Sequence, residues 1–325
     1  MSQVDVVIVN HNGGAWLPLA MTALQSQSFR DFRIVIVDND SRDGSIEALV
    51  SGTIPVTVVR SPRNLGFAAA NNLALRNHVT APWVALLNPD AFPDVDWLAA
   101  LVRATREHPD YACFGSRMRC HHDATLLDGI GDAYHVSGLY WRDGHGCPAA
   151  GKASVAREIF SPCAAAALYR TRDLLDVGGF DEDYFCYGED VDLGFRLRLA
   201  GHRALYVPAA GVAHVGSGLA GQGSDFALYH GHRNLVWNYV KNMPPALFWA
   251  CLPLHVLMNV VSLVVFATRG RGAMMWKAKV DAVRGLPAIW RKRRAVQTHR
   301  RIPVAALWRV LHRGFPRRGC ALDST

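Results

Sequence analysis

Closely spaced cysteine pairs are missing from this chain of 325 residues. Its seven cysteines are scattered, and none is arranged as Cys-x-x-Cys. The number is odd and the chain is too large to need cross-links, so a disulfide framework is not expected. We expect free thiols in a reducing compartment. The short apolar start, which holds an acid at Asp5, is not typical of a secretory signal.

The chain also lacks the phosphate-binding loop Gly-x-x-x-x-Gly-Lys-Ser/Thr. A single Gly-x-Gly-x-x-Gly motif occurs at residues 216–221. That motif binds a dinucleotide where it follows the first strand of a βαβ unit, but here it comes late and no such unit follows. The pattern argues against a nicotinamide or flavin site and favours a flexible loop beside an active site.

Acidic residues are scarce near the C-terminus. From residue 269 onward, fifteen Lys and Arg residues face only Asp281 and Asp323, and residues 246–268 carry no charge. The uncharged run is long enough to cross a bilayer, which takes roughly 20 residues. A proline and three polar residues interrupt it, so a monotopic hairpin or an interfacial helix fits equally well. A buried helix of a soluble protein is the third interpretation.

A basic, apolar end of this kind indicates an anionic partner. Residues 246–318 predict contact with an anionic membrane surface, with Trp276, Trp290 and Trp308 as interfacial anchors. Nucleic acid is not expected as a partner, because these aromatics are not interleaved at a spacing that suits base stacking.

The first third of the chain alternates between strand and helix signals. Short β-branched runs at 4–9, 34–37, 56–59 and 83–87 are separated by helical patterns at 15–27, 44–50 and 67–76. This alternation predicts an α/β fold with a mostly parallel sheet flanked by helices. Residues 111–162 are less regular, and we expect an acceptor-side region there.

Polar residues follow the predicted strands at the points where each strand ends. Ligands of open α/β sheets bind at the carboxyl ends of the strands. Each polar residue alone is ordinary turn chemistry, but together they predict a binding rim. The set is Asn10, Asn12, Asp38, Asn64, Asn88 and Asp90.

Three acids fall within four residues at the start of a predicted helix: Glu189, Asp190 and Asp192. Acids in a first helical turn complement the helix dipole, so a surface role is the simplest interpretation. The neighbouring aromatics Tyr184, Phe185 and Tyr187 would shield them from water, and shielded acids are candidates for proton transfer.

Taken together, these motifs resemble family-2 glycosyltransferases of the GT-A fold, and within them bacterial rhamnosyltransferases. The resemblance covers roughly residues 3 to 240. The segments that carry it are Val6–Asn12, Ile36–Ser41, Asn64–Asn72, Leu87–Asp90, Gly178–Glu182, Gly188–Leu193 and His214.

The resemblance implies a role for each matching position. Asp190 would be the catalytic base, with Glu189 as a supporting group, while Asp192 would be either functional or a plain helix acid. Asp90 and His214 would hold Mg²⁺ or Mn²⁺. The first acid of the family's metal-binding Asp-x-Asp motif is Asn88 here, which brings no charge, so the diphosphate would have to share in holding the metal. The nucleotide-sugar would contact Asn10, Asn12, Asp38, Asn64, Gly66, Asn71, Asn88 and Arg233.

The implied activity is inverting transfer of a sugar from a nucleotide-sugar donor to a lipid-linked or polysaccharide acceptor. Rhamnose from dTDP-rhamnose is the favoured donor, and UDP-GlcNAc, UDP-galactose and UDP-galactofuranose are the alternatives. A non-catalytic, membrane-associated binding protein with the same fold is the alternative of another class.

The same reasoning divides the chain in two. Residues 1–240 would form the catalytic domain, with a nucleotide-sugar half at 1–110 and an acceptor half at 111–240. Residues 241–325 would form an apolar, then basic, membrane-associating region. The implied location is the cytoplasmic face of the bacterial inner membrane, reached as a peripheral, monotopic or single-span protein.

Overall fold

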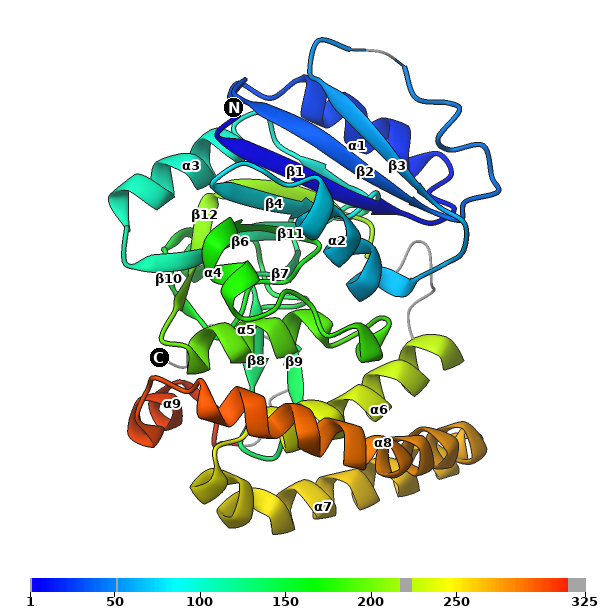
Figure 1. Cartoon of the computed structure of the whole chain (residues 1–325), viewed down its shortest axis with the longest axis vertical. Coiled ribbons are helices and arrows are strands. Elements are labelled where there is room, and N and C mark those ends of the chain that lie inside the picture. The colour runs from blue at the N-terminus through cyan, green and yellow to red at the C-terminus, as the bar shows by residue number, and fades with distance from the viewer. Residues whose placement is uncertain (1, 51, 217–223, 315–325) are drawn as a thin grey trace.

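The computed structural model describes residues 2–50, 52–216 and 224–314. Its N-terminal half is built from parallel strands joined by helices (Figure 1). The strands are β1 (Val4–Asn10), β2 (Phe32–Asn39), β3 (Val56–Ser61) and β4 (Trp83–Leu87), and the first helices are α1 (Trp16–Gln25) and α2 (Gly66–Asn77). These bounds confirm the predicted alternation except at 44–50, where the structure has a turn and no helix.

The turn at 44–50 has a local cause. The Ala48 N–H donates to the Gly44 carbonyl four residues earlier, as in an α-helix. The Leu49 N–H instead donates to the Ile46 carbonyl three residues earlier, so the helical pattern ends there. The Asp43 carboxylate accepts hydrogen bonds from Ser45 and from the Gly14 backbone of the neighbouring loop. The segment is thus tied to the first-strand loop instead of continuing as a helix.

A second group of strands completes the sheet. It comprises β5 (Ala91–Pro93), β6 (Tyr111–Cys120), β7 (Leu127–Gly129), β10 (Arg157–Ile159), β11 (Ala166–Arg170) and β12 (Arg203–His214). The sheet order is β10-β12-β6-β11-β4-β1-β2-β3, with β5 on β12 and β7 on β6. β11 runs antiparallel between β4 and β6, so the sheet is parallel on one side and mixed on the other. The strands β8 (Asp132–Tyr134) and β9 (Tyr140–Arg142) form a separate hairpin.

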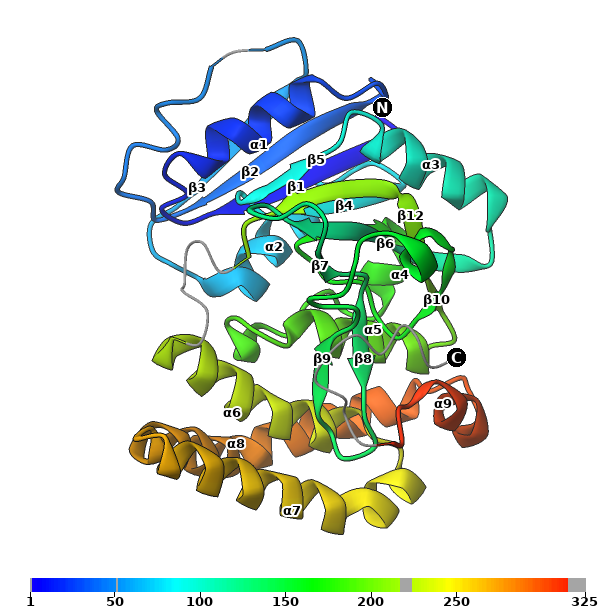
Figure 2. The same cartoon turned by 180° about the vertical axis from the view of Figure 1, so that it is seen from behind.

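Helices cover both faces of the sheet, as Figures 1 and 2 show. α1 and α3 (Trp97–Glu107) pack on one face, and α2, α4 (Thr171–Asp176) and α5 (Glu189–Leu199) pack on the other. The predicted α/β sheet flanked by helices is therefore confirmed.

Asp5 explains how an acid is tolerated inside β1. It is fully buried, and its carboxylate accepts hydrogen bonds from Arg33 on β2 and from the backbone of Thr80 and Ala81 before β4. Burial acts to raise the pKa of Asp5, but these hydrogen bonds outweigh it and lower the pKa below its usual range. The acid therefore ties together the amino ends of the strands, away from the rim.

The C-terminal helices form a separate layer beneath the sheet (Figure 1). They are α6 (Asp225–Asn242), α7 (Pro245–Thr268), α8 (Gly272–Thr298) and α9 (Val304–Val310). A shared apolar core joins them to α5 and to the β8–β9 hairpin. The predicted domain boundary at residue 240 falls within α6.

The cysteines divide into two groups. Cys113, Cys120, Cys163, Cys186 and Cys251 are free thiols, as expected. Cys147 is disulfide-bonded, so the expectation of a free thiol is wrong for this residue. Cys320 lies outside the described residues.

Candidate active site

A cavity of about 900 Å³ opens at the carboxyl ends of β1, β2 and β4. Eight of the twelve predicted site residues line it: Asn12, Asn64, Gly66, Asn88, Asp90, Glu189, Asp190 and His214. The structure therefore brings together residues that are up to two hundred positions apart in sequence. Gly216 also lines the cavity, but most of the Gly-x-Gly-x-x-Gly loop lies outside the described residues.

The other four predicted residues lie behind the lining. Asn10 is fully buried and donates to Ser41 and Ser45, while Asp38 accepts from the Ser41 backbone. Asn71 donates to a carbonyl within its own helix. Arg233 donates to the Asp183 and Tyr184 carbonyls and stacks over Trp237. These side chains support the loops that carry the rim, and their direct contact with a nucleotide stays a prediction.

The loop before α2 shapes one wall of the cavity. Asn39 donates to the Asn64 side chain at 2.9 Å and accepts from the Leu65 backbone at 2.8 Å. Gly66 has a φ of +80°, and a Cβ there would lie 2.7 Å from the Phe185 carbonyl oxygen. Only glycine lets α2 begin this close to the loop that carries Phe185.

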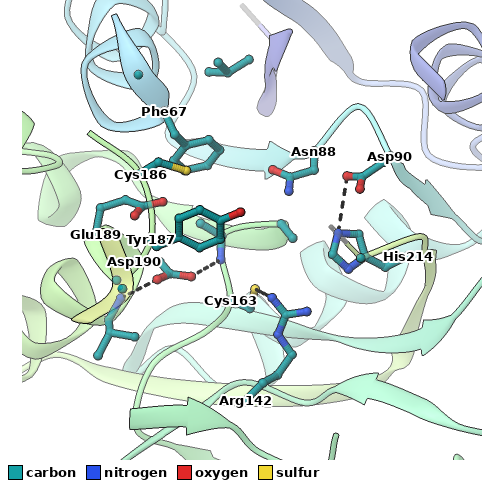
Figure 3. A pocket seen from close by; sticks show the side chains of 18 of the residues that line it. Phe67, Asn88, Asp90, Arg142, Cys163, Cys186, Tyr187, Glu189, Asp190 and His214 are labelled. Carbon is teal, nitrogen blue, oxygen red and sulfur yellow. Dashed lines mark hydrogen bonds and ion pairs between the residues drawn. The ribbon is translucent and has the colours of Figure 1, made fainter. Parts of the chain in front are cut away.

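Asp90 and His214 meet on another side of the cavity, as Figure 3 shows. Asp90 follows β4, and His214 is the last residue of β12, whose pairing with β5 sets His214 opposite Ala91. This register brings the His214 Nε2 atom to 3.4 Å from an Asp90 carboxylate oxygen. The two side chains are 4% and 6% exposed, so their contact is shielded from water.

His214 is held from behind by a residue that the sequence analysis missed. Its Nδ1 atom lies 2.7 Å from an Asp128 carboxylate oxygen, and Asp128 is also paired with Arg142. Burial would raise the pKa of Asp128, but His214, Arg142 and His145 lower it to about 2. Burial would likewise lower the pKa of His214, but the neighbouring carboxylates of Asp128 and Asp90 raise it.

This donor set fits a divalent cation. The buried Nε2 atom of His214 has no hydrogen-bond partner and is directed toward an Asp90 oxygen. No group of three or more such ligands exists among the described residues. Two protein ligands, with phosphate oxygens and water completing the shell, is the usual arrangement for Mg²⁺ at a nucleotide site.

Asp190 stands on the opposite side, in the first turn of α5 (Figure 3). Its carboxylate accepts from its neighbour Val191 N–H at 2.8 Å and from Ala164 N–H at 3.3 Å, and it faces the cavity. Glu189 beside it is 6% exposed, and its Oε2 atom has no hydrogen-bond partner. Burial, and then the charge of Asp190, raise the pKa of Glu189 well above its usual range. Glu189 is therefore suited to donate a hydrogen bond and Asp190 to accept a proton.

The β8–β9 hairpin adds residues to the cavity that the sequence did not reveal. Asp132, Tyr140, Trp141 and Arg142 come from it and line the cavity. Burial, and then the charge of Asp190, raise the pKa of Asp132 well above its usual range. The sequence signal for this part of the cavity was weak: glycines and histidines are frequent in the irregular region 111–162.

The aromatic loop before α5 is held in a strained conformation. Phe185 and Tyr187 have φ angles of 63° and 68°, which are uncommon for bulky residues. The Asn234 side chain donates to the carbonyls of Tyr184, Cys186 and Tyr187, at 3.0, 3.0 and 2.7 Å. Tyr187 is thereby placed in the cavity between Asn88 and the acids (Figure 3).

Asp192 is not an exposed helix acid, so that interpretation is wrong. It is fully buried and does not line the cavity. Its carboxylate contacts Arg196 at 2.8 Å and Lys241 at 2.6 Å, and Asn242 donates to it at 2.7 Å. Asp192 therefore joins α5 to α6.

Comparison with known proteins agrees with this geometry. Residues 5–174 match the model of glycosyl transferase family 2. An N-acetylglucosaminyl-diphospho-decaprenol L-rhamnosyltransferase of Mycobacterium tuberculosis is 29% identical over 231 residues, which are 65% of this chain and 75% of that protein. A galactofuranosyltransferase of Mycolicibacterium smegmatis is 29% identical over 206 residues, covering 61% of this chain and 66% of that protein.

The fold also matches solved glycosyltransferases. A mannosyltransferase of Pyrobaculum calidifontis, solved with GDP-Man and Mn²⁺, superposes with a TM-score of 0.56 at 19% identity, covering 91% of this chain and 84% of that one. The expected GT-A fold is thus confirmed. Because the family model spans more than half of the sequence, the chain is a member of glycosyl transferase family 2.

Proposed function

We propose that this glycosyltransferase moves a sugar, with inversion, from a nucleotide-sugar to a lipid-linked or polysaccharide acceptor in cell-surface glycan synthesis. The observation that carries the proposal is the arrangement of one cavity, in which Asp90 and His214 stand opposite Asp190 (Figure 3). The favoured donor is dTDP-rhamnose, supported by relatives that are named rhamnosyltransferases.

The two sides of the cavity would have different roles, donor binding on one and proton transfer on the other. Asn12, Asn64, Gly66 and Asn88 would contact the donor. A divalent cation held by Asp90 and His214 would supply positive charge beside the diphosphate. Asp190 would take the proton from the acceptor hydroxyl while that oxygen bonds to the anomeric carbon and the bond to the diphosphate breaks. With Asp190 acting as the base and not as a nucleophile, the transfer would be a single displacement that inverts the anomeric configuration.

Asp190→Asn is the direct test of this assignment. The amide cannot accept the proton, so we expect turnover to fall by about 10² to 10⁴-fold while donor affinity stays nearly unchanged. Donor affinity is measured by protection from thermal unfolding, and turnover by product formation. Asp176→Asn, at an exposed position outside the cavity, is the matched control. Near-normal turnover in Asp190→Asn would remove Asp190 as the base.

The donor is identified by a screen. dTDP-rhamnose, UDP-GlcNAc, UDP-galactose and UDP-galactofuranose are each added with Mg²⁺ or Mn²⁺, and thermal protection is recorded. If only a UDP-sugar protects the protein, the proposed donor would change to that sugar and the proposed reaction would stay the same. If the protein binds a donor but transfers its sugar to neither lipid-linked nor saccharide acceptors, a non-catalytic binding protein becomes the better account.

We also propose that α7 lies flat on an anionic membrane surface, on the cytoplasmic side. It is the one helix among the described residues that is long and apolar enough to cross a membrane, with a mean hydropathy of 2.1. Only 11% of its apolar window is buried, which argues against a soluble-core helix. One side carries exposed apolar residues, among them Trp249, Val256, Val260 and Val264.

The other side of α7 is anchored along its length. Phe248 packs on Trp290 of α8, His255 contacts the Ser137 carbonyl at 2.7 Å, and Asn259 accepts from Lys279 at 2.6 Å. A helix that crossed the bilayer would have to break these contacts. An orientation in the plane of the surface keeps them and places the basic residues of α8 beside anionic lipid.

A further inference from the structure

Asp128 occupies a place behind His214 that no motif marks. It belongs to the short strand β7 (Leu127–Gly129), is 3% exposed and touches the ring from the side that faces away from Asp90. Each ring nitrogen of His214 therefore faces a different carboxylate: Nδ1 lies 2.7 Å from Asp128, and Nε2 lies 3.4 Å from Asp90.

Asp128 is itself fixed in position. Arg142, the last residue of β9, pairs with its carboxylate and also reaches the Cys163 sulfur at 3.4 Å. A Cβ on Gly129 would overlap the Arg142 side chain, so the glycine leaves room for Arg142 to lie across β7. His145 contacts the Asp128 backbone carbonyl at 3.0 Å. The carboxylate therefore has little freedom to turn away from His214.

This arrangement determines which ring nitrogen carries the proton. An ionised carboxylate can only accept hydrogen bonds, and a neutral imidazole has one N–H. A ring that binds a cation is neutral, so its single hydrogen must lie on Nδ1, which is 2.7 Å from Asp128, and Nε2 presents its lone pair on the side of Asp90. Ligating histidines are commonly oriented in this way by a carboxylate behind the ring.

We propose that Asp128, held by Arg142, is a positioning residue that fixes the tautomer and orientation of His214 for a divalent cation. The inference rests on the cation site of the proposed function. A purely structural role for the Asp128–Arg142 pair is the competing account, and it predicts no effect on the ring of His214 beyond general loss of stability.

Asp128→Ala separates these accounts. Arg142 and His214 Nδ1 both contact the Oδ2 atom of Asp128, so an amide oxygen could replace it for both, whereas alanine removes the acceptor behind the ring. We expect Mn²⁺ affinity, measured by electron paramagnetic resonance with UDP or dTDP present, to fall about 10 to 100-fold. Asp123→Ala, at an exposed acid before the same strand, is the matched control and should leave Mn²⁺ affinity unchanged.

A double-mutant cycle with His214→Ala tests whether Asp128 acts through the ring. In the His214→Ala background, Asp128→Ala should cost no further Mn²⁺ affinity. Two outcomes would overturn the proposal: a loss that is fully additive, or Mn²⁺ affinity within twofold of wild type in the folded single variant. If Asp128→Ala does not fold, Arg142→Gln takes its place in the cycle, with a smaller loss expected in the same direction.

A second readout needs no metal. Nitrogen-15 NMR of the metal-free protein at alkaline pH reports the tautomer of His214, which should carry its proton on Nδ1 in the wild type and on Nε2, toward Asp90, in Asp128→Ala. An unchanged tautomer would refute the role of Asp128. Absence of Mn²⁺ binding in the wild type, with the tautomer as expected, would instead refute the cation site of the proposed function.

Discussion

At the scale of single residues, the two neighbouring acids Glu189 and Asp190 have different environments. Asp190 faces the cavity and accepts two backbone hydrogen bonds, whereas Glu189 is buried with one oxygen unpartnered. A protonated Glu189 avoids placing two like charges side by side in a shielded site. Under the proposed mechanism, Glu189 would donate a hydrogen bond and Asp190 would accept the proton.

The raised pKa of Glu189 predicts a pH-dependent stability. In the unfolded chain Glu189 loses its proton near its ordinary pKa of 4.5, while the native state keeps the proton to higher pH. The native state then binds more protons, so the free energy of unfolding falls as pH rises above that value. Glu189→Gln cannot ionise, so its stability relative to wild type should increase with pH, by at most about 1.4 kcal/mol per pH unit.

Urea denaturation between pH 4 and 8 measures this difference. Glu107→Gln serves as control, because the Glu107 side chain is 58% exposed and its carboxylate is hydrated in both the native and the unfolded state. A difference between Glu189→Gln and wild type that does not change with pH would contradict the assignment of a protonated, buried Glu189.

At the scale of elements, a buried ionic cluster joins helix α5 to the C-terminal layer. Lys241 of α6 lies 2.6 Å from both Asp181 and Asp192, and it is 1% exposed. Lys292 of α8 adds a second contact to Asp181. Charges this deeply buried are tolerated only because each is paired.

Lys241→Met should therefore be strongly destabilising. Removing the cation leaves the Asp192 charge with less compensation, and breaking a buried pair costs about 3–5 kcal/mol. Adding Asp192→Asn to the variant should recover part of the loss. Urea denaturation measures both, with Lys277→Met at an exposed position of α8 as control. A loss of stability below about 1 kcal/mol would mean that the cluster contributes no more than an exposed surface ion pair, which would contradict this prediction.

Sequence patterns predicted the elements better than the contacts between them. β1, β2 and β4 carry runs of Val, Ile and Leu, and the polar residues that end them form the rim, because parallel strands share one carboxyl edge. Asp128 and Arg142 gave no signal, since their roles depend on a hairpin and a short strand that no periodicity marks. Asp192 was ambiguous because its partner Lys241 comes from a helix some fifty residues later.

At the scale of the whole molecule, α7 lies far from the parallel strands β1 to β4 (Figure 2). Many of its apolar side chains are exposed. The outer helix α8 adds exposed Trp276, Val283 and Trp290 at seven-residue spacing, which places them on one side of that helix. Such a surface, rimmed by Lys and Arg, suits the interfacial region of an anionic bilayer.

Val260→Glu tests this surface. Val260 is 52% exposed on α7, and a charge there would have to enter the interface. We expect cosedimentation with phosphatidylcholine vesicles that contain phosphatidylglycerol to weaken at least about tenfold, since a buried charge costs several times the 1.4 kcal/mol of one decade. Val95→Glu, 53% exposed before α3, is the control. Equal binding by Val260→Glu and wild type would remove α7 as the contact surface.

The position of α6 has a consequence for the choice of acceptor. This helix contributes Phe226 and Gly231 to the cavity wall, and it also packs against α8 in the C-terminal layer. If α7 rests on the bilayer as proposed, the cavity would stand at a fixed distance from the lipid headgroups. An acceptor sugar close to its lipid anchor would reach it, whereas the far end of a long polysaccharide would lie beyond it. Of the two proposed acceptor classes, this arrangement would favour short lipid-linked intermediates.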